Sequence, residues 1–583
     1  MNRQLMLMFK NRGYSDDFYD SISRCDHPEP RNIDVMCSAL KEYYDRKDRI
    51  VLLTDFDMDG IMSGVIGFAG LAEMGFNVSL AMPTVSSGYG ITKDEIDNIK
   101  TRYPDANVIM TGDVGITAFE SISYAREIGF DVLLTDHHMP KSVAPEANVI
   151  VDPKYPDDPA YGGICGAHVM YLVMKHYAEH FTDDPVYYVN QMDRLKVFAG
   201  FGTVTDNMPV FYENRPLLMD SLAICRYAYG SGDDTSVNEI PGHSDDIYRR
   251  AFRGLYIMLK AFAEQKRMNM DHLDEDFFGF YAGPVFNSIK RMNADISLAY
   301  KVFFGSREEA EESMNTLIAL NEERKKLVND LYDQMMNTPQ PWAPFVYVID
   351  DKPGVCGLLA QKVRMTTGLP ALVLVDGDKG YHGSGRSPEW YPFLKYAGNH
   401  SDWSPAGHEN AFGIFLADER CIDSYVEFIK KDIYDKMPVG AMEPPKPDFT
   451  ISTLGDGDTE IDVDLFMEFL EEIEMCRPFG SGFPKPDIEL KFKPKECYWT
   501  LMGSDKNHVR VTLPRGLTLV CFNQGDMFGG TIDPSNMPEV ISVRGSLALN
   551  VFMGQTSVQF MGVLPQECAY KAEGDICVDG DEC

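Results

Sequence analysis

Residues 50–60 read IVLLTDFDMDG, an aliphatic run that ends in a group of aspartates and a glycine. Similar short runs follow at residues 77–81, 107–111, 131–135 and 148–151, and stretches of helical character separate them. Continuous apolar strands that alternate with helices are typical of a parallel sheet covered on both faces. We therefore expect an α/β domain whose sheet is built from these five runs.

Acidic residues or histidines directly follow four of the five runs. They are Asp55, Asp57 and Asp59 after the first run, Asp113 after the third, Asp136, His137 and His138 after the fourth, and Asp152 after the fifth. Parallel strands bring their carboxyl ends to one edge of a sheet, where such proteins form their sites. Each aspartate alone is best explained as a turn former or helix N-cap. Together they would repel one another unless cations neutralise them, which predicts a metal centre.

The ligand types narrow the choice of metal. Carboxylates with imidazole, and no accompanying sulfur ligand, favour Mn²⁺ or Mg²⁺ over structural zinc. A further acid, Asp206 in FGTVTDNMP, follows after a helical interval. Two divalent ions that share a bridging carboxylate would activate a water molecule and stabilise the leaving oxygen of a phosphoester. Gly60 permits a tight turn into the next helix, whose amino terminus favours phosphate.

A chain of 583 residues is too long for a single core, so several domains are expected. The expected segments are an N-terminal helical extension at 1–48, the first α/β domain at 49–305, a charged connector helix at 306–338, a second and smaller α/β domain at 339–440, a linker and helix at 441–485, a small β-barrel at 486–565 and an acidic tail at 566–583.

The formal net charge of −35 favours small substrates, because a strongly acidic protein repels nucleic acid at long range. Part of this excess is peripheral, since residues 566–583 hold six carboxylates against one lysine. No apolar run reaches the roughly 18 residues of a membrane span, and the first residues do not form a signal peptide. Twelve cysteines without a repeated CxxC spacing indicate reduced thiols in the cytoplasm.

The ordered motifs DFDMDG, TGDVGIT, TDHH and GTVTDNMP resemble the four phosphoesterase motifs of the DHH family. GPVFN at 283–287 with Arg291 resembles the family's GPxxNA-x-GR stretch, with Lys290 at the place of its usual glycine. GVCGLLAQKV, GSGRS at 383–387 and AGHENAFG at 406–413 resemble the companion DHHA1 domain. RPFGSGFPKP, MGSDKNHVRV and VRGSLALNVFMGQTSVQF resemble the OB-fold domain of RecJ-like members and its lead-in.

The resemblance implies roles for the matching residues. The metal ligands would be Asp57, Asp59, Asp113, His137 and Asp206, with Asp113 as the bridge. Asp55 and Asp136 would orient these ligands, and His138 would contact the scissile phosphate. Substrate-binding residues would be Arg291, Ser384, Arg386 and His408, the last three holding the terminal phosphate. In the OB domain, candidates to bind a nucleic-acid strand are Tyr498, Trp499, His508, Arg510 and Phe522, although an aromatic residue there more often fills the core.

The function implied is 5′-to-3′ hydrolysis of single-stranded DNA to mononucleotides, in DNA repair, recombination or replication. The implied cofactors are two divalent cations, with Mn²⁺ favoured over Mg²⁺. A single-strand binding protein or a helicase would be a partner, and a monomer is expected. The acidic charge leaves open an oligoribonucleotide or cyclic-dinucleotide phosphodiesterase, while an inactive replication scaffold ranks last because every ligand is present. Serines in MPTVSSGYGIT replace an arginine common before GYG, a departure that bears on binding of the 5′ end.

Overall fold

The computed structural model describes residues 8–15, 17–82, 90–141, 143–232, 247–266, 268–350, 352–441, 446–454, 463–503, 505–552, 555–565 and 568. The chain divides into two compact units, Cys25–Pro444 and the combination of Met1–Arg24 with Pro445–Cys583. The serines before GYG and almost all of the acidic tail lie outside the described residues. Among the described helices, none is both long and apolar enough to cross a membrane.

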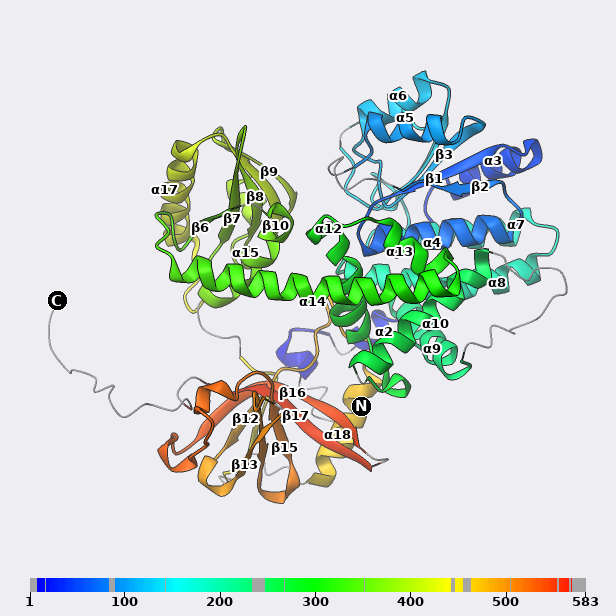
Figure 1. Cartoon of the computed structure of the whole chain (residues 1–583). Coiled ribbons are helices and arrows are strands. Elements are labelled where there is room, and N and C mark those ends of the chain that lie inside the picture. The colour runs from blue at the N-terminus through cyan, green and yellow to red at the C-terminus, as the bar shows by residue number, and fades with distance from the viewer. Residues whose placement is uncertain are drawn as a thin grey trace. The chain divides into compact units, whose positions relative to one another are not determined.

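The first sheet consists of five parallel strands in the order β2-β1-β3-β4-β5 (Figure 1). These strands are β1 (Arg49–Thr54), β2 (Val78–Leu80), β3 (Ala106–Gly112), β4 (Asp131–Thr135) and β5 (Val149–Val151). All five predicted runs therefore form strands. Every one of β1, β3 and β4 is almost wholly buried, because helices cover both faces of the sheet.

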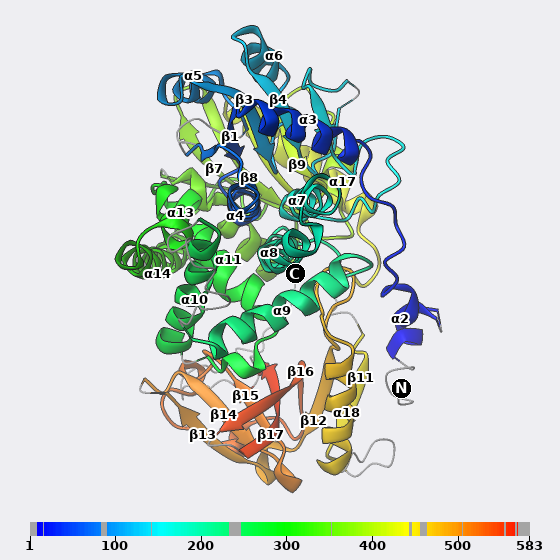
Figure 2. The same ribbon diagram turned by 90° about the vertical axis from the view of Figure 1, so that its right-hand side faces the viewer.

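Two layers of helices enclose this sheet. Helices α5 (Lys93–Arg102) and α6 (Phe119–Glu127) pack on one face, through an aliphatic core that includes Val51, Ile109 and Val132. On the other face, α4 (Met58–Glu73), α7 (Gly166–Phe181) and α8 (Pro185–Thr205) pack against one another, and Figure 2 views them nearly end-on. The remaining helices of this domain are α3 (Ile33–Arg46), α9 (Asn214–Gly230), α10 (Ile247–Lys266), the short η2 (Met270–His272), the π-helix η3 (Phe277–Ala282), α11 (Gly283–Phe286), α12 (Ser288–Met292) and α13 (Ser297–Phe304).

The long helix α14 (Arg307–Asn337) joins this domain to a second α/β block (Figure 1). It begins with a capping box, in which Ser306 and Glu309 each accept a hydrogen bond from the other's backbone. The second sheet has the order β6-β7-β8-β10-β9, parallel only between β6 and β7. Its elements are β6 (Val346–Ile349), η4 (Pro353–Val355), α15 (Cys356–Thr367), β7 (Ala371–Gly377), β8 (Gly380–Arg386), α16 (Phe393–Ala397), β9 (Trp403–His408), β10 (Ala411–Leu416) and α17 (Glu419–Lys436).

The other unit is built on a seven-stranded sheet in the order β11-β12-β16-β17-β15-β14-β13. Its elements are α2 (Phe18–Ser21), β11 (Phe449–Ser452), α18 (Val463–Met475), β12 (Ile488–Phe492), η5 (Pro494–Glu496), β13 (Tyr498–Met502), β14 (His508–Thr512), η6 (Pro514–Gly516), β15 (Thr518–Cys521), η7 (Asp526–Phe528), η8 (Pro534–Asn536), β16 (Ile541–Phe552) and β17 (Gln555–Val563). Strand β11 pairs with β12, although it lies in the range 441–485 that the sequence analysis treats as linker and helix.

The start of the chain packs within this second unit. The Arg12 guanidinium donates hydrogen bonds to both carboxylate oxygens of Asp448, at 2.8 and 2.6 Å. Tyr14 stacks on Phe18 with ring centroids 3.8 Å apart, and both rings lie within 6.5 Å of Phe483. The extension predicted at 1–48 is therefore divided, because α3 belongs to the other unit and packs on α7.

Candidate metal centre

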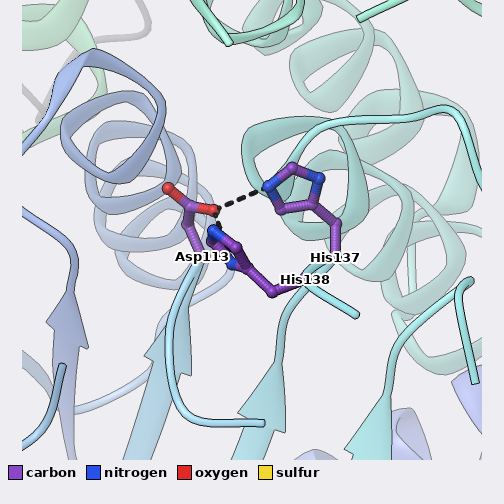
Figure 3. A group of neighbouring side chains, drawn as sticks. All are labelled: Asp113, His137 and His138. Carbon is purple, nitrogen blue, oxygen red and sulfur yellow. Dashed lines mark ion pairs between the residues drawn. The ribbon is translucent and has the colours of Figure 1, made fainter. Parts of the chain in front are cut away.

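Three of the predicted ligands surround the Nε2 atom of His137, and Figure 3 shows one of them, Asp113, between His137 and His138. The Nε2 atom faces three carboxylate oxygens, Asp113 Oδ1 at 3.1 Å, Asp206 Oδ2 at 3.4 Å and Asp59 Oδ2 at 3.7 Å. Asp113 and His137 follow the neighbouring strands β3 and β4, whereas Asp206 is the C-cap residue of α8. The strand ends and one helix end thus bring together groups that lie far apart in the sequence.

The DFDMDG segment supplies a second set of carboxylates. One oxygen each of Asp55, Asp57 and Asp113 lie within 4.8 Å of one another. Asp57 is also the N-cap of α4, because it accepts hydrogen bonds from the backbone N–H groups of Asp59 and Gly60 at 3.1 and 3.2 Å. A Cβ at Gly60 would lie 2.3 Å from the Asp55 carbonyl oxygen, so this turn requires glycine.

The carboxylate of Asp59 is held in a cradle of backbone groups. Its oxygens accept hydrogen bonds from the N–H groups of Gly166 at 2.7 Å and Ala167 at 3.0 Å, in the first turn of α7. Gly202 of α8 leaves the space for it, since a Cβ there would lie 2.1 Å from Asp59 Oδ1. A helix amino terminus therefore fixes a carboxylate whose other contacts face the cluster.

His137 presents an unprotonated nitrogen to the cluster. Its Nδ1 lies 3.0 Å from the Ile164 carbonyl oxygen, which can only accept, so Nδ1 carries the proton. Burial lowers the pKa of His137 to about 3, and the ring is neutral. The lone pair of Nε2 consequently points at the carboxylates, as in a metal-binding histidine whose other nitrogen is fixed by a hydrogen bond.

Asp136 and His138 form a separate pair beside this cluster. His138 Nδ1 donates to Asp136 Oδ1 at 2.7 Å, and the N–H of Ile116 donates to Asp136 Oδ2 at 2.9 Å. Burial acts to lower the pKa of His138, but the hydrogen bond to Asp136 and the negative charges of Asp136, Asp206 and Asp57 together outweigh it and raise the pKa to about 9. Asp136 is buried, whereas 29% of the His138 side chain is exposed. The pair therefore presents a cationic ring to an incoming group.

The cluster fits divalent cations. Asp55 Oδ2, Asp113 Oδ1 and His137 Nε2 are buried and have no hydrogen-bond partner among the described residues. Burial, reinforced by repulsion from the neighbouring acids, raises the pKa of Asp113 well above its ordinary value and that of Asp55 to about 7. Asp113 also adopts a left-handed backbone with φ of 62°, a strained conformation typical of functional sites. Oxygen and imidazole donors in this arrangement suit Mn²⁺ or Mg²⁺.

The second block brings Ser384, Arg386 and His408 to one face of its sheet. Arg386 of β8 and His408 of β9 both pair with Ala411 of β10, so they stand in one row across the three strands. Ser384 lies two residues before Arg386 and shares its face. A Cβ at Gly357 would lie 2.8 Å from Arg386 Nη2, which places the guanidinium against the first turn of α15. This face combines a guanidinium, an imidazole, a hydroxyl and a helix amino terminus, as phosphate sites do.

Arg291 belongs to the same cationic region. Its backbone packs on the second block, because a Cβ at Gly354 would lie 2.5 Å from the Arg291 carbonyl oxygen. Burial lowers the pKa of Arg291 to about 10, and the charges of Arg324 and Arg386 add to this effect. The sequence gives no sign of Arg324, which is one of many charged residues on α14. Lys290, at the family's usual glycine, lies 4.2 Å over the ring of Phe56.

The candidates of the OB region divide between two faces of the sheet. Tyr498 and Phe522 are 73% and 56% exposed, and Arg510 is exposed on the strand beside Tyr498. The His508 ring contacts Phe522 edge-on. Trp499 points the other way, since its ring contacts Phe492 and Phe528 and its Nε1 donates to the Pro494 carbonyl at 3.0 Å. Trp499 is therefore half-buried against the core of this sheet, and the nucleic-acid contact predicted for it stays a prediction.

Comparisons with known proteins agree with this geometry. The model of the DHH family, N-terminal domain, matches residues 49–194, which contain the sheet and most of its acidic edge. The model of the RecJ OB domain matches residues 457–563. The fold and the site thus define a DHH-family domain followed by an OB domain of the RecJ type.

Curated relatives cover nearly the whole chain. The single-stranded-DNA-specific exonuclease RecJ of Bacillus subtilis is 25% identical over 568 residues, which span 94% of this chain and 64% of that protein. RecJ of Haemophilus influenzae is 23% identical over 91% of this chain and 89% of its own length. A crystal structure of Thermus thermophilus RecJ in complex with Mn²⁺ shares the fold with a TM-score of 0.68 at 22% identity, over 96% of this chain and 75% of that one. The chain therefore contains a DHH-family domain and an OB domain of the RecJ type, and it is similar to RecJ proteins along most of its length.

Proposed function

We propose that the chain is a metal-dependent exonuclease that hydrolyses single-stranded DNA from its 5′ end and releases mononucleotides, in DNA repair, recombination or replication. The observation that carries this proposal is the self-repelling cluster around His137 Nε2, which fits two divalent cations. The face that carries Arg386 and His408 belongs to the same compact unit, and burial, then the charges of Lys154, His138 and Arg386, lower the pKa of His408. The relatives named as single-stranded-DNA-specific exonucleases support the choice of substrate.

The residues proposed to hold the two cations are Asp57, Asp59, Asp113, His137 and Asp206, with Asp113 between them. Structures of the Thermus relative contain Mn²⁺ or Mg²⁺, and we propose Mn²⁺ as the principal cofactor here. When bound, such a pair activates water and stabilises the leaving oxygen of a phosphodiester.

The chain's own groups position the strand. Asp136 keeps His138 charged and oriented, so that the ring can bind an oxygen of the scissile phosphate. Ser384, Arg386 and His408, with Arg291 beside them, would hold the phosphate of the 5′ end. Anchoring of the end at one site and hydrolysis at the other would release one nucleotide at a time.

The test compares substrates under one set of conditions. With Mn²⁺, single-stranded DNA labelled at its 3′ end should be shortened from the 5′ end, and duplex DNA of the same sequence should not. Arg386→Ala should raise KM about tenfold and remove the preference for a 5′-phosphate, because a charge-assisted hydrogen bond is lost. Faster hydrolysis of a diribonucleotide or a cyclic dinucleotide than of single-stranded DNA would contradict the proposal.

We further propose that the protein acts as a monomer in the cytoplasm, with a single-strand binding protein or a helicase as its partner. One compact unit, Cys25–Pro444, contributes all residues of the centre. The cysteines that the structure describes are free thiols, as expected in a reducing compartment. Light scattering at working concentration should give the mass of one chain.

A further inference from the structure

Lys154 lies in a loop that leaves the first sheet beside the metal centre. Thr135 at the end of β4 pairs with Val151 at the end of β5, and the N–H of Asp136 donates to the Val151 carbonyl at 3.1 Å. The chain after Val151 therefore starts next to the segment that carries His138. This register alone brings Lys154 to the edge where the predicted ligands meet.

The loop holds Lys154 in a fixed position. Asp152 is 1% exposed, and its Oδ1 accepts a hydrogen bond from the backbone N–H of Lys154 at 2.8 Å. The aliphatic stem of Lys154 passes close to Gly162, where a Cβ would lie 3.6 Å from Lys154 Cγ. The backbone and the first part of the side chain are thus anchored, and the half-buried side chain needs little ordering when it binds a ligand.

The ammonium group of Lys154 has no hydrogen bond or ion pair in the part of the chain that the structure describes. Its charge also reaches the second block. Burial lowers the pKa of His408, and the charge of Lys154 lowers it further. The register at Asp136 and Val151 places Lys154 beside the metal centre, and its ammonium lies within electrostatic reach of the face that carries His408.

We propose that Lys154 is a substrate-binding residue, whose ammonium contacts a phosphate of the terminal nucleotide between the metal centre and the face of Arg386 and His408. This inference rests on the exonuclease function proposed above. A compact ammonium on a flexible stem suits a phosphate oxygen, which it binds as a point charge. Lys154 thereby adds a cation between the carboxylates of the metal centre and the face that carries Arg386.

The experiment compares Lys154→Met and Lys154→Arg with Lys260→Met, which removes the same charge from the surface of α10, where Lys260 lies 4.0 Å from Glu264. Lys154→Met should raise KM for single-stranded DNA about tenfold, with a smaller fall in kcat, because a charge-assisted contact is lost. Fluorescence anisotropy measures the binding of a 5′-phosphorylated oligonucleotide in Ca²⁺. For Lys154→Met, the slope of log affinity against log salt should be shallower by about 0.7 than for the wild type. Lys154→Arg should retain most of the affinity.

Several results would overturn the inference. If Lys154→Met had the same KM and the same salt slope as Lys260→Met, the ammonium would contact no phosphate. Weaker Mn²⁺ binding by calorimetry, with an unchanged salt slope, would show that Lys154 merely supports the metal centre. Absence of hydrolysis by the wild-type protein would refute the exonuclease function, whereas the anisotropy measurement would still report the phosphate contact of Lys154.

Discussion

Replacement of Gly202 by alanine tests whether the packing of α8 against Asp59 positions that carboxylate as a metal ligand. The new Cβ would lie 2.1 Å from Asp59 Oδ1, 2.9 Å from Cys165 Sγ and 3.0 Å from the Ala167 Cβ. Because neighbours on two sides are tightly packed, the carboxylate has to move by roughly 1 Å or more. It would then lose its hydrogen bonds from Gly166 and Ala167, which are 2.7 and 3.0 Å long.

The size of the effect follows from these contacts. Loss of one or both charge-assisted hydrogen bonds should lower the free energy of unfolding by about 3 kcal/mol. Displacement of a ligand by this amount should weaken Mn²⁺ binding by about 10- to 100-fold and slow hydrolysis by a similar factor. Titration calorimetry measures the affinity for Mn²⁺, and urea unfolding measures the stability.

Gly200→Ala is the matched control, since it makes the same change on the same helix. Its Cβ would lie 2.3 Å from Ser221 Oγ rather than near the cluster, so it should lower stability and leave the affinity for Mn²⁺ unchanged. If Gly202→Ala bound Mn²⁺ as tightly as Gly200→Ala, Asp59 would not be a ligand that this packing positions.

Three further outcomes are expected. Asp57→Asn should keep the N-cap hydrogen bonds and change the free energy of unfolding by less than about 0.5 kcal/mol, while hydrolysis falls at least about a hundredfold in the same preparation. Burial lowers the pKa of His168 to about 4, so the neutral ring stabilises the fold fully above pH 6.5. This stabilisation, on the order of 3 kcal/mol, is lost as the pH falls from 6.5 to 4. In His168→Gln the free energy of unfolding in urea should depend less on pH across this range, and the same pH dependence as in the wild type would contradict the linkage. Trp499→Ala should lower the free energy of unfolding by about 3 kcal/mol, whereas Arg510→Ala should leave it unchanged and reduce only the affinity for single-stranded DNA, measured by anisotropy.

The sheet and its acidic edge could be predicted because their signals are local. An aliphatic run such as residues 50–54 forms a buried strand wherever helices cover both faces, and the residue that follows it must lie at the carboxyl edge. Asp206 is harder to place by pattern, since it ends a helix rather than a strand. The residues alone indicate it only as a further acid after a helical interval, and its role as a metal ligand comes from the family resemblance.

The rest depends on contacts between distant segments. Trp499 and Tyr498 are adjacent aromatic residues, and strand periodicity shows that they face opposite ways without showing which face is buried. Strand β11 follows a proline-rich segment and becomes a strand only because β12 offers it an edge. The union of residues 8–24 with the C-terminal unit leaves no local trace, since Arg12 and Asp448 are separated by 436 positions.

That union has a consequence for biosynthesis. The aromatic residues around Phe9 and Tyr14 are translated long before the Phe483 ring that they pack against. This segment must therefore remain solvated until the residues around Phe483 have left the ribosome. A deletion of residues 8–24 should accordingly damage the unit that contains the OB domain and spare the unit Cys25–Pro444, which can fold earlier in synthesis.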